Sequence, residues 1–293
     1  MSKKIKMVLV LVVMLSLVSF VQADIRWFWG NGQTADWANP GGGWSGGIVP
    51  TPADNPGTSW AIIVHPCTVN VTTAGQGCGG LWLGYESGTS TLNIADGIAF
   101  QVPWQIMMGY GGACETCDGT GVLNIGVDAS VDCWQLQLGV GAAPYHGIIN
   151  IADGGLLTTG TLGVACQIGV AGPGEIHMTG TGSMTTQTLP VFGTYGSLDI
   201  ELGSLKVAGD YRAQLQGYVD NGRITSQGGT SPRCFPVVSY HDGYTWVKTS
   251  GCTCTTYVEA DVNRDCYVDF SDFALLAQGW LNCINPADAN CVL

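Results

Sequence analysis

Charged residues are scarce in this sequence, and basic residues are the scarcest of all. Lys, Arg, Asp and Glu make up 11% of the 293 residues, and 10 basic residues face 22 acidic ones, which gives a net charge of -12. No Lys or Arg occurs between Arg26 and Lys206. Nucleic acid phosphates require a basic surface, so this composition argues against a nucleic-acid partner.

A hydrophobic run long enough to cross a membrane is also missing. The apolar segment at residues 7–20 has about 14 residues, short of the ~20 that a transmembrane helix needs. Three lysines precede it, and small residues suited to cleavage follow it before Asp24. We therefore predict a signal peptide at residues 1–23 and a secreted, extracellular or cell-surface mature protein without a membrane span. A lipid-anchored or uncleaved N-terminus is the alternative.

Residues that favour exposed helices are few, whereas glycine is abundant. The chain contains 44 glycines and is 46% hydrophobic. Closely stacked β-turns suit this composition, while a helical protein would need more Glu, Lys, Ala and Leu on its surfaces. We expect an all-β body.

One short pattern occurs five times between Cys78 and Val207. Each copy is an apolar residue closed by Gly, a turn, and then Leu or Ile, a polar residue, and Ile or Met. The closing glycines are Gly84, Gly109, Gly139, Gly169 and Gly193. They lie 25, 30, 30 and 24 residues apart, a spacing typical of a solenoid in which each repeat is one β-coil stacked on the last. The apolar residues one and three steps before each glycine are predicted to face inward.

The end of each copy predicts a strand with one polar face, because its two aliphatic residues face inward and force the residue between them outward. Neighbouring rungs lie ~4.8 Å apart, so the outward side chains could hydrogen-bond along the stack. These outward residues form one column, which consists of Asn93, Asn124, Asn150, His177 and Asp199. The column is either a stabilising ladder or a ligand-binding strip, with His177 and Asp199 as its paired acid and base.

These patterns predict an all-β fold, a right-handed parallel β-helix (solenoid), with a small C-terminal α-helical module. The predicted parts are the signal peptide (1–23), an N-terminal cap rich in Trp and Gly (24–77), the coils (78–212), a closing β segment and tether (213–256) and the C-terminal module (257–293). Asp242-Gly243 between two strand-like runs predicts a hairpin in the closing segment. The cap, from Trp37-Ala38-Asn39-Pro40 through Trp44 to the strand-like residues 61–64, resembles the openings of secreted bacterial β-helix proteins of the autotransporter-repeat kind.

Aromatic residues near the closing glycines have two interpretations. Tyr85 and Tyr110 follow their glycines directly and would stack at a coil corner, and Trp104 and Trp134 would face inward if their strands are straight. Alternatively, Trp82, Tyr85 and Tyr110 form a platform for sugar rings.

Twelve cysteines in an exported chain predict disulfides, because the secretory compartment is oxidising. Their connectivity cannot be read from the sequence. Cys114 and Cys117 form a C-x-x-C pattern, which we interpret as a disulfide that pins a loop. Redox chemistry and a metal site are the alternatives.

The coils offer little for catalysis. A pectate-lyase-type site needs an Arg or Lys base, which the coils lack except at their far end, and no Asp-Asp pair of the polygalacturonase type occurs. The fold could still bring two carboxylates together, and the candidates are Asp96, Asp128, Asp153 and Glu175.

The C-terminal module contains the most specific motif. Residues 261–272 place side-chain oxygens at loop positions 1, 3, 5, 9 and 12 and a backbone carbonyl at position 7. Ca²⁺ takes six to eight oxygen ligands, and this alternation turns every second residue toward one centre. The predicted Ca²⁺ ligands are Asp261, Asn263, Asp265, Tyr267, Asp269 and Asp272.

This stretch and the helix predicted after it resemble a type I dockerin repeat, the module by which secreted glycoside-degrading proteins attach to cohesin-bearing scaffolds. The resemblance implies Ca²⁺ as a cofactor and a cohesin-like protein as a partner. The chain departs from the family in having one evident repeat instead of two, and in having Cys266 at loop position 6, where Gly is usual.

The sequence favours a secreted, non-catalytic β-helix protein for extracellular interaction or surface structure, with a calcium-binding dockerin-like tail. The alternative is a polysaccharide-degrading or carbohydrate-binding protein that the tail recruits to an extracellular complex. An enzyme of this architecture would be a polysaccharide hydrolase or lyase.

Overall fold

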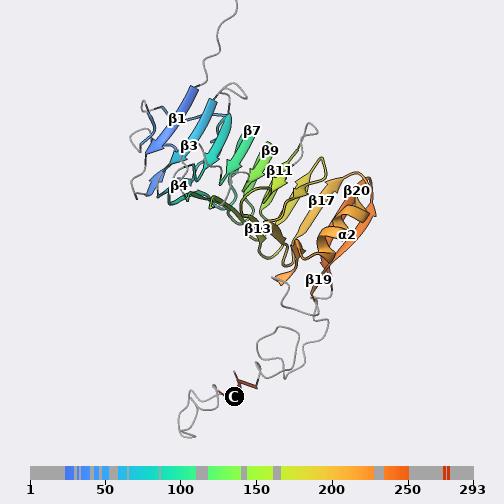
Figure 1. The fold of residues 1–293 in the computed structure, drawn as a ribbon. Helices are drawn as coiled ribbons and strands as arrows, with labels where there is room; N and C mark the ends of the chain where they lie inside the picture. The colour runs from blue at the N-terminus through green and yellow to red at the C-terminus, as the bar shows by residue number, and fades with distance from the viewer. Residues whose placement is uncertain are drawn as a thin grey trace, which may run out of the picture.

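The computed structural model describes residues 24–29, 32, 34–39, 43–45, 48–52, 59–64, 66–85, 87–109, 118–139, 144–160, 166–227, 234–250, 273–274 and 276–277. The predicted signal peptide and all six predicted calcium ligands lie outside these residues. The described body is mostly β, as expected, and Figure 1 shows its strands succeeding one another along the molecule from the blue to the orange end.

Two sheets share the strands, which alternate between them along the chain. The 12-stranded sheet is called sheet A here, and the 8-stranded sheet is called sheet B. The order in sheet A is β1 (Asp24–Trp29), β3 (Ser59–Val64), β5 (Gly80–Leu83), β7 (Ala99–Met108), β9 (Ser130–Leu138), β11 (Leu156–Thr159), β14 (Ser183–Thr186), β17 (Ser204–Ala208), β20 (Tyr244–Ser250) and β19 (Phe235–His241). The short strands β12 (Gln167–Ile168) and β15 (Val191–Phe192) continue from the second half of β9.

Sheet B lies across the core from sheet A and is parallel throughout its described length. Its order is β18 (Ile224–Thr225), β16 (Gly196–Asp199), β13 (Gly174–Met178), β10 (His146–Ile151), β8 (Thr120–Ile125), β6 (Thr89–Ile94), β4 (Cys67–Val71) and β2 (Thr34–Asp36). From β1 to β18 the chain returns repeatedly to the same two sheets, and the pairs among these strands are parallel, an arrangement compatible with a solenoid-like fold.

The alternating pattern places its aliphatic residues in the core, as predicted. In sheet B, Leu92, Leu123 and Ile149 are in register and are each 0% exposed. The rows that precede the closing glycines are also buried. These rows are Leu83, Met108, Leu138, Ile168 and Phe192, and Leu81, Ile106, Leu136, Cys166 and Pro190.

Space requires all five closing glycines, and backbone angle requires all of them except Gly193. Gly84 has φ +68°, a left-handed conformation, and a Cβ there would lie 2.3 Å from the backbone nitrogen of Gly121 in the next coil. Gly193 differs, because it has no left-handed φ, and a Cβ there would lie 2.3 Å from the Gly169 carbonyl oxygen. Close approach of two coils is the shared reason for glycine.

The straight strand on which the inward orientation of Trp104 and Trp134 was conditional is not found in β7. The pairing of β7 with β9 has a register irregularity between Val102 and Gln105, and both indoles are half-buried with their rings 4.5 Å apart, edge to face. The strands bend here, and the bend breaks the period of two on which the prediction depended. The two indoles therefore pack against each other and stay partly open to solvent.

Aromatic rings fill the N-terminal end of the core. Trp37 is 0% and Trp44 is 4% exposed, and their rings are 4.9 Å apart. Trp37 also contacts Phe100 at 4.9 Å, and Phe28 contacts Trp44 at 5.1 Å. Parallel pairing extends past these rings to β1 and β2, so the regular strands begin well before residue 78.

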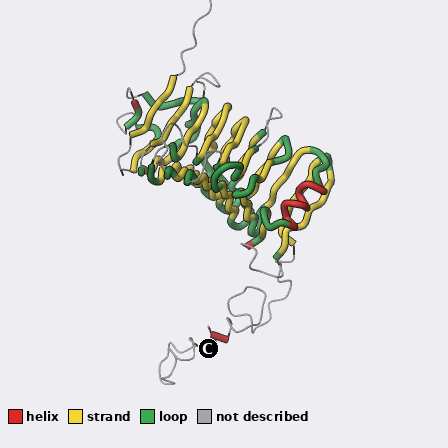
Figure 2. The backbone as a smooth tube through the Cα atoms, in the orientation of Figure 1, coloured by secondary structure: helices red, strands yellow, loops and turns green. Residues whose placement is uncertain are grey.

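At the C-terminal end the sheet changes direction. Strands β17, β20 and β19 pair antiparallel, and Asp242 and Gly243 have φ values of +54° and +80°, as the predicted hairpin requires. Helix α2 (Arg212–Asp220), which the sequence did not predict, follows β17, and its Leu215 is buried. Figure 2 shows this helix in red beside the last strands. No helix among the described residues is long and apolar enough to cross a membrane.

The prediction that the cysteines are disulfide partners is wrong for two core residues. Cys133 and Cys166 are free, fully buried thiols, and burial raises the pKa of Cys133 to about 12 and that of Cys166 well above its ordinary value. Cys234 is disulfide-bonded. In the coils, cysteine therefore behaves as a small apolar residue at inward positions.

Candidate functional site

The outer face of sheet B carries a ladder of asparagine side chains. Asn93 donates to Asn70 at 2.8 Å, Asn124 donates to Asn93 at 2.7 Å, and Asn150 donates to Asn124 at 2.7 Å, each from Nδ2 to Oδ1. The four residues occupy one register column and are half-buried. The structure thus brings together the three predicted asparagines and adds Asn70, which precedes the first repeat recognised in the sequence.

Beyond Asn150 the column continues into His177 and Asp199, but these two do not form the predicted acid-base pair. The Nε2 atom of His177 lies 3.0 Å from Oε2 of Glu175, which is two residues earlier on the same face of β13. Asp199 instead accepts a hydrogen bond from Thr225 at 3.4 Å. The carboxylate partner of His177 is therefore Glu175.

Glu175 also contacts a second imidazole from the neighbouring strand. The Nε2 atom of His146 on β10 lies 3.1 Å from Oε1 of Glu175. This approach is not aligned as a hydrogen bond, so its attraction is electrostatic and depends on protonation of His146. The carboxylate thus stands between two histidines, with one oxygen toward each. We call His146, Glu175 and His177 the His-Glu-His cluster.

The cluster has the groups of a general acid or base, all of them partly open to solvent. The side chains of His146, Glu175 and His177 are 26%, 34% and 42% exposed. Their two imidazoles contact different oxygens, and the described residues contain no group of three His, Cys, Asp or Glu side chains arranged for a metal ion. The arrangement can hold or move a proton at Glu175.

Sequence reasoning found His177 and Glu175 separately but missed their pairing and the role of His146. The alternation in β13 was sufficient to find the first contact, because residues two apart on a strand share a face. The second contact depends on which strand lies beside β13. No local pattern around His146 shows that.

The candidate carboxylates Asp96, Asp128 and Asp153 lie elsewhere, in the turns that follow sheet B. Asp96 accepts a hydrogen bond from the Val127 backbone at 2.8 Å. Asp153 accepts from both the backbone and the hydroxyl of Thr181, and these bonds lower the pKa of Asp153. Both carboxylates hold the turn of the next coil, which is a structural role.

The aromatic candidates on the outer face of sheet A lie close together. Trp82 and Tyr85 are stacked with ring centres 5.2 Å apart and planes inclined by 19°. Trp60 approaches Trp82 at 5.1 Å, and Trp27 approaches Tyr85 at 5.8 Å. All four are half-buried, and the third candidate, Tyr110, lies outside the described residues. A Cβ at Gly80 would lie 2.7 Å from the Trp60 ring, so glycine there lets the indole lie on the strand.

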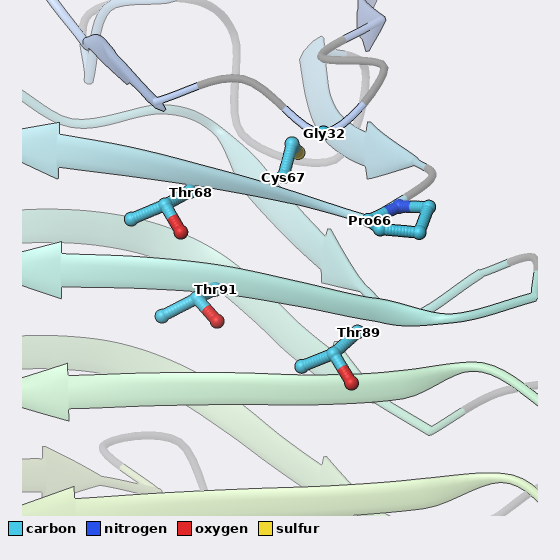
Figure 3. A pocket seen from close by; sticks show the side chains of 6 residues that line it. All are labelled: Gly32, Pro66, Cys67, Thr68, Thr89 and Thr91. Atoms are coloured by element: carbon cyan, nitrogen blue, oxygen red, sulfur yellow. The ribbon is translucent and has the colours of Figure 1, made fainter.

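A hollow of about 290 Å³ opens on sheet B near the N-terminal end. Figure 3 shows Thr68 and Thr91 on neighbouring strands within it, and the two are in register. Its lining offers hydroxyl groups and no charged side chain, so it suits a neutral polar group. The lining residues are Gly32, Pro66, Cys67, Thr68, Thr89 and Thr91.

Comparison with known proteins gives no relative of this chain. No family model, no curated protein and no solved structure matches it.

Proposed function

We propose that this is a secreted, non-catalytic β-helix protein that serves in extracellular interaction or surface structure and carries a calcium-binding, dockerin-like tail. The observation that carries the proposal is the asparagine ladder. Its amides are engaged with one another along the stack, so the most regular polar feature of the molecule serves the scaffold.

The architecture in this proposal is a right-handed parallel β-helix. The repeated return of the chain to two sheets whose strands pair in parallel from β1 to β18 supports it, because each return to the same sheet needs a crossover connection. Such connections are right-handed in nearly all proteins. A β-helix presents long, flat outer faces on which the strands are evenly spaced, and such faces suit contact with extended partners.

The tail is proposed to bind Ca²⁺ through the ligands from Asp261 to Asp272, on the evidence of the sequence pattern. Calorimetric titration of the mature chain with CaCl₂ should show one site. The double variant Asp261→Asn, Asp265→Asn should lose it, because a hard cation needs the carboxylate charge at these positions. Asp153→Asn, in a coil turn, is the matched control and should leave the titration unchanged. Absence of binding heat at millimolar calcium in the wild-type chain would contradict the calcium proposal.

The partner proposed for the dockerin-like tail is a cohesin-like protein. The partner proposed for the β body is an extracellular polysaccharide. A panel of purified glycans, screened for both binding and cleavage, tests the body. Binding without turnover is the expected result.

The second candidate function is action on a polysaccharide, and the His-Glu-His cluster is the observation that favours it. A carboxylate beside two imidazoles suits a general base that takes a proton from the water attacking a glycosidic bond. Turnover of any glycan in the panel that Glu175→Gln abolishes and Asp96→Asn preserves would replace the non-catalytic proposal with this one.

A further inference from the structure

The positive charge of the described residues is concentrated at one end of the molecule. Apart from Arg26, their Lys and Arg side chains all belong to the last coil and the closing hairpin. Arg212 pairs with Asp210 at 2.9 Å, and Arg223 donates to the carbonyls of Gly193 and Gly196. Within the described chain, Lys206 and Lys248 have no carboxylate at ion-pair distance.

These two lysines lie on the outer face of β17 and β20. Figure 1 labels both strands toward the orange end of the molecule. Lys206 is directly opposite Trp246, while the next pair, Leu205 and Val247, is 0% exposed and marks the inner face. The ammonium group of Lys206 lies 4.0 Å from the ring centre of Tyr244 and 4.9 Å from that of Trp246. Lys248 lies 4.2 Å from the Trp246 ring centre.

His241 completes this surface from the edge strand β19. Its ring is stacked on Trp246 at 5.3 Å, with the planes inclined by 9°. The carboxylate nearest to it is the exposed Asp242, 3.3 Å from its Nδ1. We call Lys206, His241, Tyr244, Trp246 and Lys248 the basic aromatic face.

Hydroxyl groups extend the face along sheet A. Thr158, Thr185 and Lys206 occupy one register column on β11, β14 and β17, and Trp246 follows them on β20. The two threonines are half-buried on the outer side. A ligand lying along this column would meet hydroxyls, then a cation, then an aromatic ring.

We propose that the basic aromatic face binds a polysaccharide bearing carboxylate groups. Tyrosine and tryptophan rings offer flat apolar surface to the C–H faces of sugars, lysine ammonium groups pair with carboxylates, and the threonines meet sugar hydroxyls. The proposal rests on the proposed extracellular role and names the class of glycan for it. The site is distinct from the calcium tail, the asparagine ladder and the His-Glu-His cluster.

The charge of the chain favours this ligand over denser polyanions. A net charge of -12 repels a nucleic acid, which carries one charge per ~1.7 Å of duplex. A carboxylated glycan has its charges farther apart, and charges more than ~8 Å apart are largely screened at physiological salt, so two lysines without a described carboxylate at ion-pair distance can hold it locally.

Affinity electrophoresis and calorimetry of the mature chain with polygalacturonate test the proposal. The wild type should bind, and Lys206→Gln, Lys248→Gln should weaken binding about tenfold, which corresponds to ~1.4 kcal/mol. Arg212→Gln is the matched control, because it removes a cation that is already paired, and its affinity should stay within about twofold, in line with the small effects of exposed pairs. Trp246→Phe keeps a ring and should retain part of the affinity.

Binding assays with polyglutamate, dextran sulfate and a neutral glucan distinguish a carboxylated polysaccharide from other polymers that could occupy the basic aromatic face. Equal binding of polyglutamate would show recognition of charge alone and overturn the sugar-specific site. Tighter binding of dextran sulfate at equal charge would overturn the carboxylate assignment. Absence of polygalacturonate binding, or binding unchanged in the double lysine variant, would also overturn the proposal, while the calcium titration and the turnover assay test the proposed function independently.

Discussion

At the scale of single residues, the asparagine ladder shows how a polar side chain is held on an outer face. Asn124 has ladder bonds on both sides, whereas Asn70 at the end has one. Each amide keeps hydrogen-bonding capacity for solvent, but its partners are fixed by the register of the strands. The position of each asparagine in the column therefore decides how much it contributes to the free energy of unfolding.

Replacing Asn124 with Ala should therefore cost more than replacing Asn70. Asn124→Ala removes two ladder bonds, the one to Asn93 and the one from Asn150, and we expect a loss of about 1–2 kcal/mol in the free energy of unfolding. Asn70→Ala should cost roughly half as much, because it removes one bond. Urea unfolding followed by circular dichroism measures both. Equal losses would show that the ladder bonds do not contribute individually.

Two causes explain the glycine at position 84: its left-handed backbone angle and the close approach of the neighbouring backbone. Gly97 has only the first of these causes, so comparing the two positions separates them. Both have φ +68°, but a Cβ at Gly97 meets nothing within 4 Å. Gly97→Ala should cost about 1 kcal/mol from the backbone angle alone. Gly84→Ala should cost at least about 2 kcal/mol, because neighbouring coils must also move apart. If urea unfolding gives the same loss for both, the proposed clash with the Gly121 backbone is wrong.

The Cys133 thiol should not react with alkylating reagents in the folded protein. Its pKa is raised from 9.0 to about 12 by burial, so the folded state holds the proton more tightly than the unfolded state does. Its contribution to stability is complete below pH 9 and is lost as the pH rises toward 12. We expect no alkylation by iodoacetamide at pH 8 in buffer and full alkylation in urea, as measured by mass spectrometry of the Cys133 peptide. In Cys133→Ala, the fall in stability above pH 9 should be smaller. Rapid labelling in buffer would contradict the buried position.

At the scale of elements, helix α2 depends on a strand that is distant in sequence. Its N-cap residue, Tyr211, makes no side-chain cap. The fully buried Thr245 of β20 accepts a hydrogen bond from the Tyr211 backbone at 2.8 Å and donates one to the Gly209 carbonyl at 2.7 Å. One hydroxyl thus joins the start of α2 to the closing hairpin. No helix signal near residue 212 is strong, which is why the sequence did not predict this helix.

The isosteric change Thr245→Val should loosen α2 and the hairpin together. It leaves a backbone donor and an acceptor without partners, and we expect a loss of about 1–3 kcal/mol and faster amide exchange in residues 212–220. Thr158→Val, on the outer face of β11, is the matched control and should change stability by less than about 0.5 kcal/mol. Unchanged exchange in α2 would rule out Thr245 as its anchor.

At the scale of the whole molecule, each strand pairs with its neighbours in the same sheet, and one core of inward apolar residues runs between the sheets. The ends differ. Aromatic rings around Trp37 fill the core at the start, and an antiparallel hairpin with α2 follows the last parallel strands. Apart from Arg26, the Lys and Arg side chains of the described residues gather at that second end, so the two ends differ in charge. A ligand specific for Lys206 and Lys248 would meet the molecule at one end only.

The sequence alone determined the strands on either side of each closing glycine and the inward rows, because these depend on an alternation that each repeat carries within itself. It also determined the asparagine column, since a repeated outward position is repeated in space. The tertiary structure decided which polar groups meet across coils: Glu175 with His146, Thr245 with the start of α2, and Lys206 with Trp246. It decided the bend that leaves Trp104 partly open to solvent and the burial of Cys133 and Cys166 as thiols. These contacts join residues far apart in the chain, and they follow from the register between neighbouring strands, which no single repeat encodes.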